Sequence, residues 1–121
     1  MPGLSIIVAA DDARRLYAAL ETAMASAALG RPARLFLQGD AAALLRAPVH
    51  FAGDAPRRAA GQPTLAQMVE EAAAMDVALI VCQSGLALTG TAAGELVSQA
   101  QAGGLVSFLA GLGPEDSLVV Y

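Results

Sequence analysis

The sequence contains no lysine and no tryptophan, and only 4% of its 121 residues are aromatic. Proteins that bind nucleic acids usually present a basic surface with aromatic side chains for stacking, whereas this chain carries a net charge of −4. We therefore expect no nucleic-acid partner. Although 56% of the residues are hydrophobic, no apolar stretch reaches the roughly 18 residues that span a bilayer. We expect no membrane partner either.

The chain also has only one cysteine, Cys82, and one histidine, His50. A lone cysteine cannot close an intrachain disulfide, and a lone histidine without neighbouring carboxylates offers no ligand set for a metal. Neither a phosphate-binding Gly-Lys-Ser/Thr loop nor a Gly-x-Ser-x-Gly nucleophile elbow is present. We expect no metal and no cofactor. No basic segment precedes the first short apolar run, so we expect a cytoplasmic protein with a reduced thiol.

Positive charge is absent from the second half of the chain. All seven arginines lie between Arg14 and Arg58, and residues 59–121 contain no cation. These charges either cover solvated surfaces or mark an arginine-bearing half and an acidic half that meet between subunits. Residues 47–63 form a connection longer than most, typical of a lid, an interface arm or a mobile loop. One hypothesis is a small-ligand site formed between subunits under this loop, with Arg57 or Arg58 facing an anion.

Apolar runs alternate with segments of helical periodicity along the whole chain, which we interpret as a single domain over residues 1–121. Parallel neighbouring strands need crossover helices, so this order predicts an α/β fold with a mostly parallel five-stranded sheet between two helical layers. The strands are predicted at residues 4–9, 33–37, 77–81, 105–109 and 117–121. Helices are predicted after Asp11 or Asp12 up to Gly30, over 41–46, from the capping box at Thr64 and Gln67 onward, and near 92–102, with a short helical or irregular segment at 86–90.

In open α/β sheets, ligands bind beyond the carboxyl ends of the strands. Cys82 follows a predicted strand at that edge and is the only intrinsically nucleophilic residue there. The residues that we expect to border it are Asp11, Asp12, Gln38, Gln83, Ser84 and Gly85.

Cys82 is either a buried structural thiol or a reactive group, because free cysteine is among the most buried residue types. A reactive thiol needs a lowered pKa, and its own half of the chain supplies no cation. Activation would have to come from backbone N–H groups after Cys82, from arginines of the first half, or from a neighbouring subunit.

Three segments, residues 29–37, 64–84 and 103–109, resemble the DsrE/DsrF-like (DsrEFH-like) sulfur-relay family in its small single-domain members. The resemblance implies a three-layer α/β/α domain that assembles into trimers or hexamers. It also implies that Cys82 carries sulfur as a persulfide between donor and acceptor proteins. One thiol suffices for such a relay, and no resolving cysteine is needed.

Two hypotheses of different classes follow. In the first, the chain is a sulfur carrier acting through Cys82, with the backbone amides of residues 83–85 holding the thiolate. In the second, it is a non-catalytic assembly or small-ligand-binding subunit in which Cys82 belongs to the core.

Overall fold

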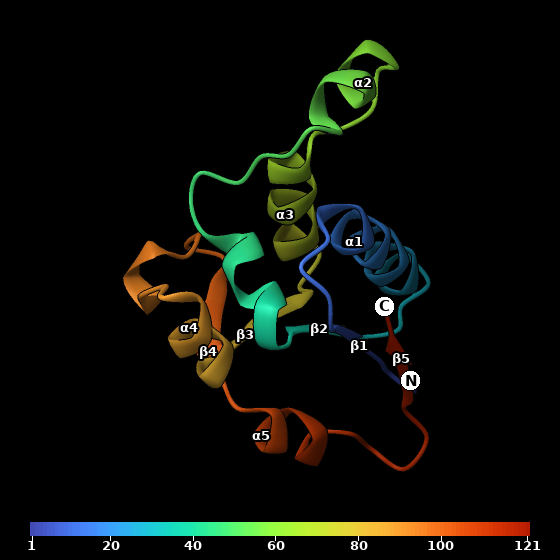
Figure 1. The fold of residues 1–121 in the computed structure, drawn as a ribbon. Helices are drawn as coiled ribbons and strands as arrows, with labels where there is room; N and C mark the ends of the chain where they lie inside the picture. Colours follow the sequence, from blue (N-terminus) through green and yellow to red (C-terminus); the bar gives the residue numbers. More distant parts are fainter.

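A computed structural model describes residues 1–121. Its centre is a five-stranded sheet in the order β4-β3-β2-β1-β5 (Figure 1). Every pair of neighbouring strands is parallel, so all carboxyl ends meet at one edge. The predicted α/β fold with a parallel five-stranded sheet is therefore confirmed. The strands are β1 (Leu4–Val8), β2 (Ala33–Leu37), β3 (Ala78–Cys82), β4 (Ala100–Gly103) and β5 (Ser117–Val120).

One face of the sheet, here called the first face, is covered by α1 (Ala13–Ala28) and α3 (Leu65–Ala74) (Figure 1). Asp12 caps α1 by accepting hydrogen bonds from the backbone of Arg14 and Arg15. The predicted capping box of Thr64 and Gln67 opens α3. The apolar faces of these helices pack on the sheet in a cluster of 22 buried residues. This cluster is the main core of the domain.

The opposite face, here called the second face, is covered by the six-residue helix α5 (Leu105–Ala110), on the other side of the sheet in Figure 1. Only four buried residues form its apolar cluster, and the rings of Phe36 and Phe108 meet there with their centroids 5.0 Å apart. The other two members are Ile7 and Cys82. The sheet thus has one heavily covered face and one lightly covered face.

The carboxyl edge carries two short helices that pack together. The 3-10 helix η1 (Gly39–Leu45) follows β2, and α4 (Gln83–Thr89) follows β3 directly. The predictions for these regions were close, at 41–46 and 86–90. The third strand ends at Cys82 rather than at residue 81. Cys82 is therefore the last residue of the strand and lies inside the fold.

The prediction was wrong between residues 92 and 109. The expected helix at 92–102 is a 3-10 turn, η2 (Ala93–Glu95), followed by β4, and the expected strand at 105–109 is α5. A short apolar run such as 105–109 fits a strand or a helix equally well by periodicity. β4 consists of small and polar residues without a strand signal. A Cβ at Gly103 would lie 2.8 Å from Ile80 Cγ2, so the close approach to β3 favours glycine there.

Residues 47–63 contain a helix, α2 (Asp54–Ala59), which projects from the body of the domain (Figure 1). Its base is tied to the core, because the Tyr17 hydroxyl donates to the Pro63 carbonyl at 2.8 Å. The guanidinium of Arg57 lies 4.1 Å from the centre of the Tyr17 ring and donates to the Gly53 carbonyl. Arg57 is thus part of the packing of this segment, while Arg58 is exposed. None of the helices has the length and apolar character needed to cross a membrane.

Candidate functional site

Cys82 points toward the second face of the sheet. Side chains alternate along β3, so Leu79 and Val81 enter the main core while Ile80 and Cys82 face the opposite way. The Cys82 side chain packs in the cluster that contains Phe108, and the residue is only 5% exposed.

Hydrogen-bonding groups surround the sulfur. Ser84 Oγ lies 3.1 Å from Cys82 Sγ, and the hydroxyl can donate to the thiolate. Backbone N–H groups of Gly39, Gly85 and Ser84 also lie near the sulfur and lower the pKa of the thiol. Two of these three groups come from the first turn of α4, and the third comes from the start of η1. The thiolate therefore has donors on two elements of the carboxyl edge.

These donors determine the acidity of the thiol. Burial raises the pKa of Cys82, because desolvation penalises the charged sulfur. The Ser84 hydroxyl and the backbone amides favour the thiolate, and together they outweigh burial, so that the pKa lies below its ordinary value. No cation contributes to this shift. Of the three sources of activation considered from the sequence, the backbone amides act within this chain.

The contribution of Gly39 depends on a close contact between η1 and α4. Gly85 is buried against η1, and a Cβ there would lie 2.5 Å from the Gly39 carbonyl oxygen and 2.9 Å from Ala42 Cβ. Gly39 itself adopts a φ of +59°, which favours glycine. Sequence reasoning did not include Gly39 in the site. The available signal was its position in the turn after β2, the strand next to β3.

The other residues expected at this edge occupy different surroundings. Asp12 is engaged in capping α1 and in an ion pair with Arg15 at 3.6 Å, and Asp11 is exposed. Both follow β1, which is separated from β3 by β2, so they begin about 10 Å to the side. Gln38 directly precedes Gly39 but makes no side-chain hydrogen bond, and Gln83 is exposed. Ser84 and Gly85 are the bordering residues that the structure brings to the sulfur.

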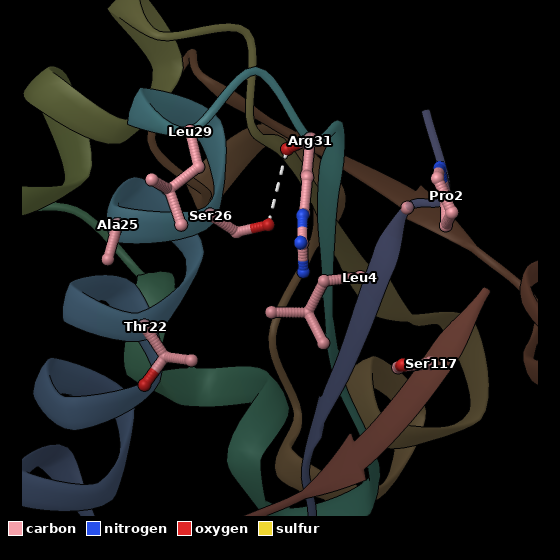
Figure 2. A pocket seen from close by; sticks show the side chains of 9 residues that line it. Pro2, Leu4, Thr22, Ala25, Ser26, Leu29, Arg31 and Ser117 are labelled. Carbon is pink, nitrogen blue, oxygen red and sulfur yellow. Dashed lines mark hydrogen bonds between the residues drawn. The ribbon is translucent and has the colours of Figure 1, made fainter.

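The structure contains no group of three or more histidine, cysteine, aspartate or glutamate side chains that could hold a metal ion. A pocket of about 280 Å³ lies at the opposite, amino-terminal end of the sheet, between α1 and the starts of β1 and β5 (Figure 2). Leu4, Ser26 and Arg31 line it, and the Ser26 hydroxyl donates to the Arg31 carbonyl at 3.2 Å. It does not include Cys82.

Comparison with known proteins agrees with this architecture. The ychN protein from E. coli superposes on the whole chain with a TM-score of 0.75 at 21% identity, and both chains are covered completely. A protein of unknown function from Methanobacterium thermoautotrophicum, MTH1491, is similar over the full length of both chains with a TM-score of 0.76 at 12% identity. A search of curated proteins gave no match. At these identities the two structures support the fold alone. The model of the DsrE/DsrF-like family matches residues 4–121, nearly the whole sequence, and the chain belongs to that family.

Proposed function

We propose that the protein is a persulfide carrier that acts through Cys82. The observation that carries this proposal is the set of hydrogen-bond donors around the sulfur, which lowers the pKa of a buried thiol without any cation. The thiolate is the nucleophile in sulfur chemistry, so stabilising it raises the reactive fraction near neutral pH. Membership of the DsrE/DsrF-like family supports the same role.

The chemistry requires one thiol. The Cys82 thiolate attacks the outer sulfur of a donor persulfide, R–S–SH. A bond forms between Cys82 Sγ and that sulfur, the donor S–S bond breaks, and its electron pair leaves on the donor thiolate. An acceptor thiolate then attacks the outer sulfur on Cys82 and regenerates the Cys82 thiolate. The same donors that hold the starting thiolate hold it again as a leaving group.

The test is intact-mass spectrometry after incubation with a sulfane sulfur donor. We expect the wild-type protein to gain the mass of one sulfur atom and to lose it on addition of a reductant. The variant Cys82→Ser should gain none, because it lacks the nucleophile. Absence of any added sulfur on the folded wild-type protein across several donors would contradict the proposal.

The second face supports a further part of this proposal, self-association into a homo-oligomer such as a trimer or hexamer. Strands of parallel sheets are normally covered on both faces. On α5 itself Val106 is 83% exposed, and on β5 Leu118 is 43% and Val120 62% exposed. Light scattering should give a mass of several chains for the wild-type protein. The variant Val120→Glu should have a lower mass. The control Leu88→Glu changes an exposed leucine on α4 and should keep the mass of the wild type. A monomeric wild-type protein would contradict assembly.

A non-catalytic assembly or ligand-binding subunit is the second candidate, and the 5% exposure of Cys82 favours it. The rate of labelling by a small thiol reagent distinguishes the two functions. A carrier should react in the native state faster than its unfolding rate allows. Labelling that proceeds only at the rate of unfolding would indicate a structural cysteine.

A further inference from the structure

A pocket of about 190 Å³ lies under α5 on the second face, between that helix and the edge formed by β3 and β4. It adjoins the thiol, since the lining residue Gly103 pairs with Cys82 in the sheet and the lining residue Phe108 packs in the same cluster as Cys82. Its apolar side is Ile80 and Phe108, and its polar side includes Arg34 and Gln101. The pocket and the thiol therefore lie on the same face of the sheet with Phe108 in contact with both, although Cys82 does not line the pocket.

Arg34 gives this pocket a fixed positive charge. Its Nε and Nη2 donate to Ser5 Oγ at 3.2 and 2.8 Å, and the guanidinium lies 4.2 Å from the centre of the Phe108 ring. No carboxylate lies within ion-pair distance of Arg34. The guanidinium is thus positioned by neutral partners, and its Nη1, which lies beside Gly111, makes no hydrogen bond within the protein.

The charge around Arg34 is asymmetric. A second pocket, of about 270 Å³, lies on the other side of the guanidinium and includes the carboxylate of Asp116. The pocket under α5 is lined by no acidic residue. The side chains of Gln101 and Ser107, which also line it, make no hydrogen bond within the protein and can donate to a ligand. An anion bound beside Arg34 in the pocket under α5 would therefore meet no carboxylate in the lining.

The strand register determines how long a ligand must be. Arg34 pairs with Ala78, four residues before Cys82 on β3. At about 3.3 Å per residue, Arg34 and Cys82 are therefore offset by about 13 Å along the strands. The long arginine side chain reduces the distance to be bridged. A ligand the size of free cysteine is too short for this distance, whereas an extended peptide of two or three residues matches it.

We propose that the pocket under α5 binds the carboxylate of a small peptide persulfide and directs its outer sulfur to Cys82. This inference rests on the proposed carrier function and names its donor class. The sulfur step is unchanged: the bond to Cys82 Sγ forms, the donor S–S bond breaks, and the electron pair leaves on the peptide thiolate. Arg34 holds the carboxylate and does not take part in bond making, so it is a binding residue for the donor.

The test compares two donors that differ only in charge, glutathione persulfide and the same compound with its carboxylates esterified. Intact mass measured over time gives the rate of Cys82 loading for each donor. In the wild type we expect the free acid to load about tenfold or more faster, because a charge-assisted hydrogen bond contributes more than a neutral one. In Arg34→Gln this ratio should fall to about one, while the ester still loads.

A second variant, Gln101→Glu, keeps Arg34 and its packing but places a carboxylate in the exposed lining of the pocket. We expect it to slow loading by the free acid and to leave loading by the ester unchanged. The matched control, Arg58→Gln, removes an exposed arginine outside this pocket and should alter neither rate. Equal rates for the two donors in the wild type would overturn the inference and leave the carrier function intact. Failure of both donors to load Cys82 would contradict the carrier function itself.

Discussion

The two faces of the sheet differ in the size of their buried apolar clusters and in whether they carry the candidate site. The main core of 22 buried residues lies on the first face, where α1, α3, η1 and α4 all contribute to it, whereas the second face has a buried cluster of four to which α5 contributes Phe108. Cys82 and the pocket with Arg34 both belong to the second face. Buried apolar area is the main source of stability, so the first face contributes most of the stability, while the proposed site lies on the second face.

The largest expected effect concerns stability. Leu79 is fully buried in the first-face cluster, and Leu79→Ala should lower the free energy of unfolding by about 2–5 kcal/mol through lost burial and a cavity. Its matched partner is Leu105→Ala, a half-buried leucine at the start of α5, for which we expect less than half of that loss. Urea unfolding followed by circular dichroism measures both. Equal losses would contradict the division of roles between the faces.

A smaller loss of stability is expected from a change at the contact between α4 and η1. In Gly85→Ala the new Cβ would collide with Gly39 and Ala42, so η1 must move away from the sulfur. Overpacking of this kind costs about 1–3 kcal/mol, and loss of the Gly39 amide should raise the pKa of Cys82. The control Gly39→Ala keeps the amide and has open space for its Cβ, although its φ of +59° disfavours alanine.

The pH dependence of Cys82 alkylation separates these two glycine variants. Gly85→Ala should shift the midpoint to higher pH, and Gly39→Ala should leave it closer to that of the wild type. A midpoint unaffected by Gly85→Ala would show that the amide of Gly39 does not hold the thiolate.

The smallest expected effect on stability concerns Ser84, whose hydroxyl is the largest single cause that lowers the pKa of Cys82. Ser84→Ala removes the hydroxyl donor 3.1 Å from the sulfur, so the pKa of Cys82 should rise toward its ordinary value. Because the folded pKa in the wild type is lowered, its contribution to stability is complete above the pKa of the unfolded thiol and is lost as pH falls through the folded pKa. The difference in unfolding free energy between wild type and Ser84→Ala should therefore grow with rising pH.

Alkylation rates measured against pH check the shift directly, with Ser98→Ala as a control at an exposed serine away from Cys82. If Ser84→Ala and Ser98→Ala titrate alike, the Ser84 hydroxyl has no role in acidifying the thiol.

Much of the fold could be predicted from local sequence patterns, namely apolar runs and helix caps. The runs that became β1, β2, β3 and β5, and the capping box of Thr64 and Gln67, were predicted within a residue or so. Residues 100–109 were assigned to the wrong elements, because β4 has no strand-forming side chains and α5 is a short apolar run. In both, packing against the sheet overrides weak local preference.

The candidate site was likewise predicted only in part, for the residues that are close to Cys82 in the sequence. The sequence by itself placed Cys82 at the carboxyl end of a predicted buried strand, with Ser84 and Gly85 after it and no cation in its half of the chain. Only the tertiary structure brought Gly39 to the sulfur through the close packing of η1 on α4, and placed Arg34 on the face toward which Cys82 points. Local order follows from residue spacing, whereas these contacts join segments more than 40 residues apart and exist only once the strands have paired.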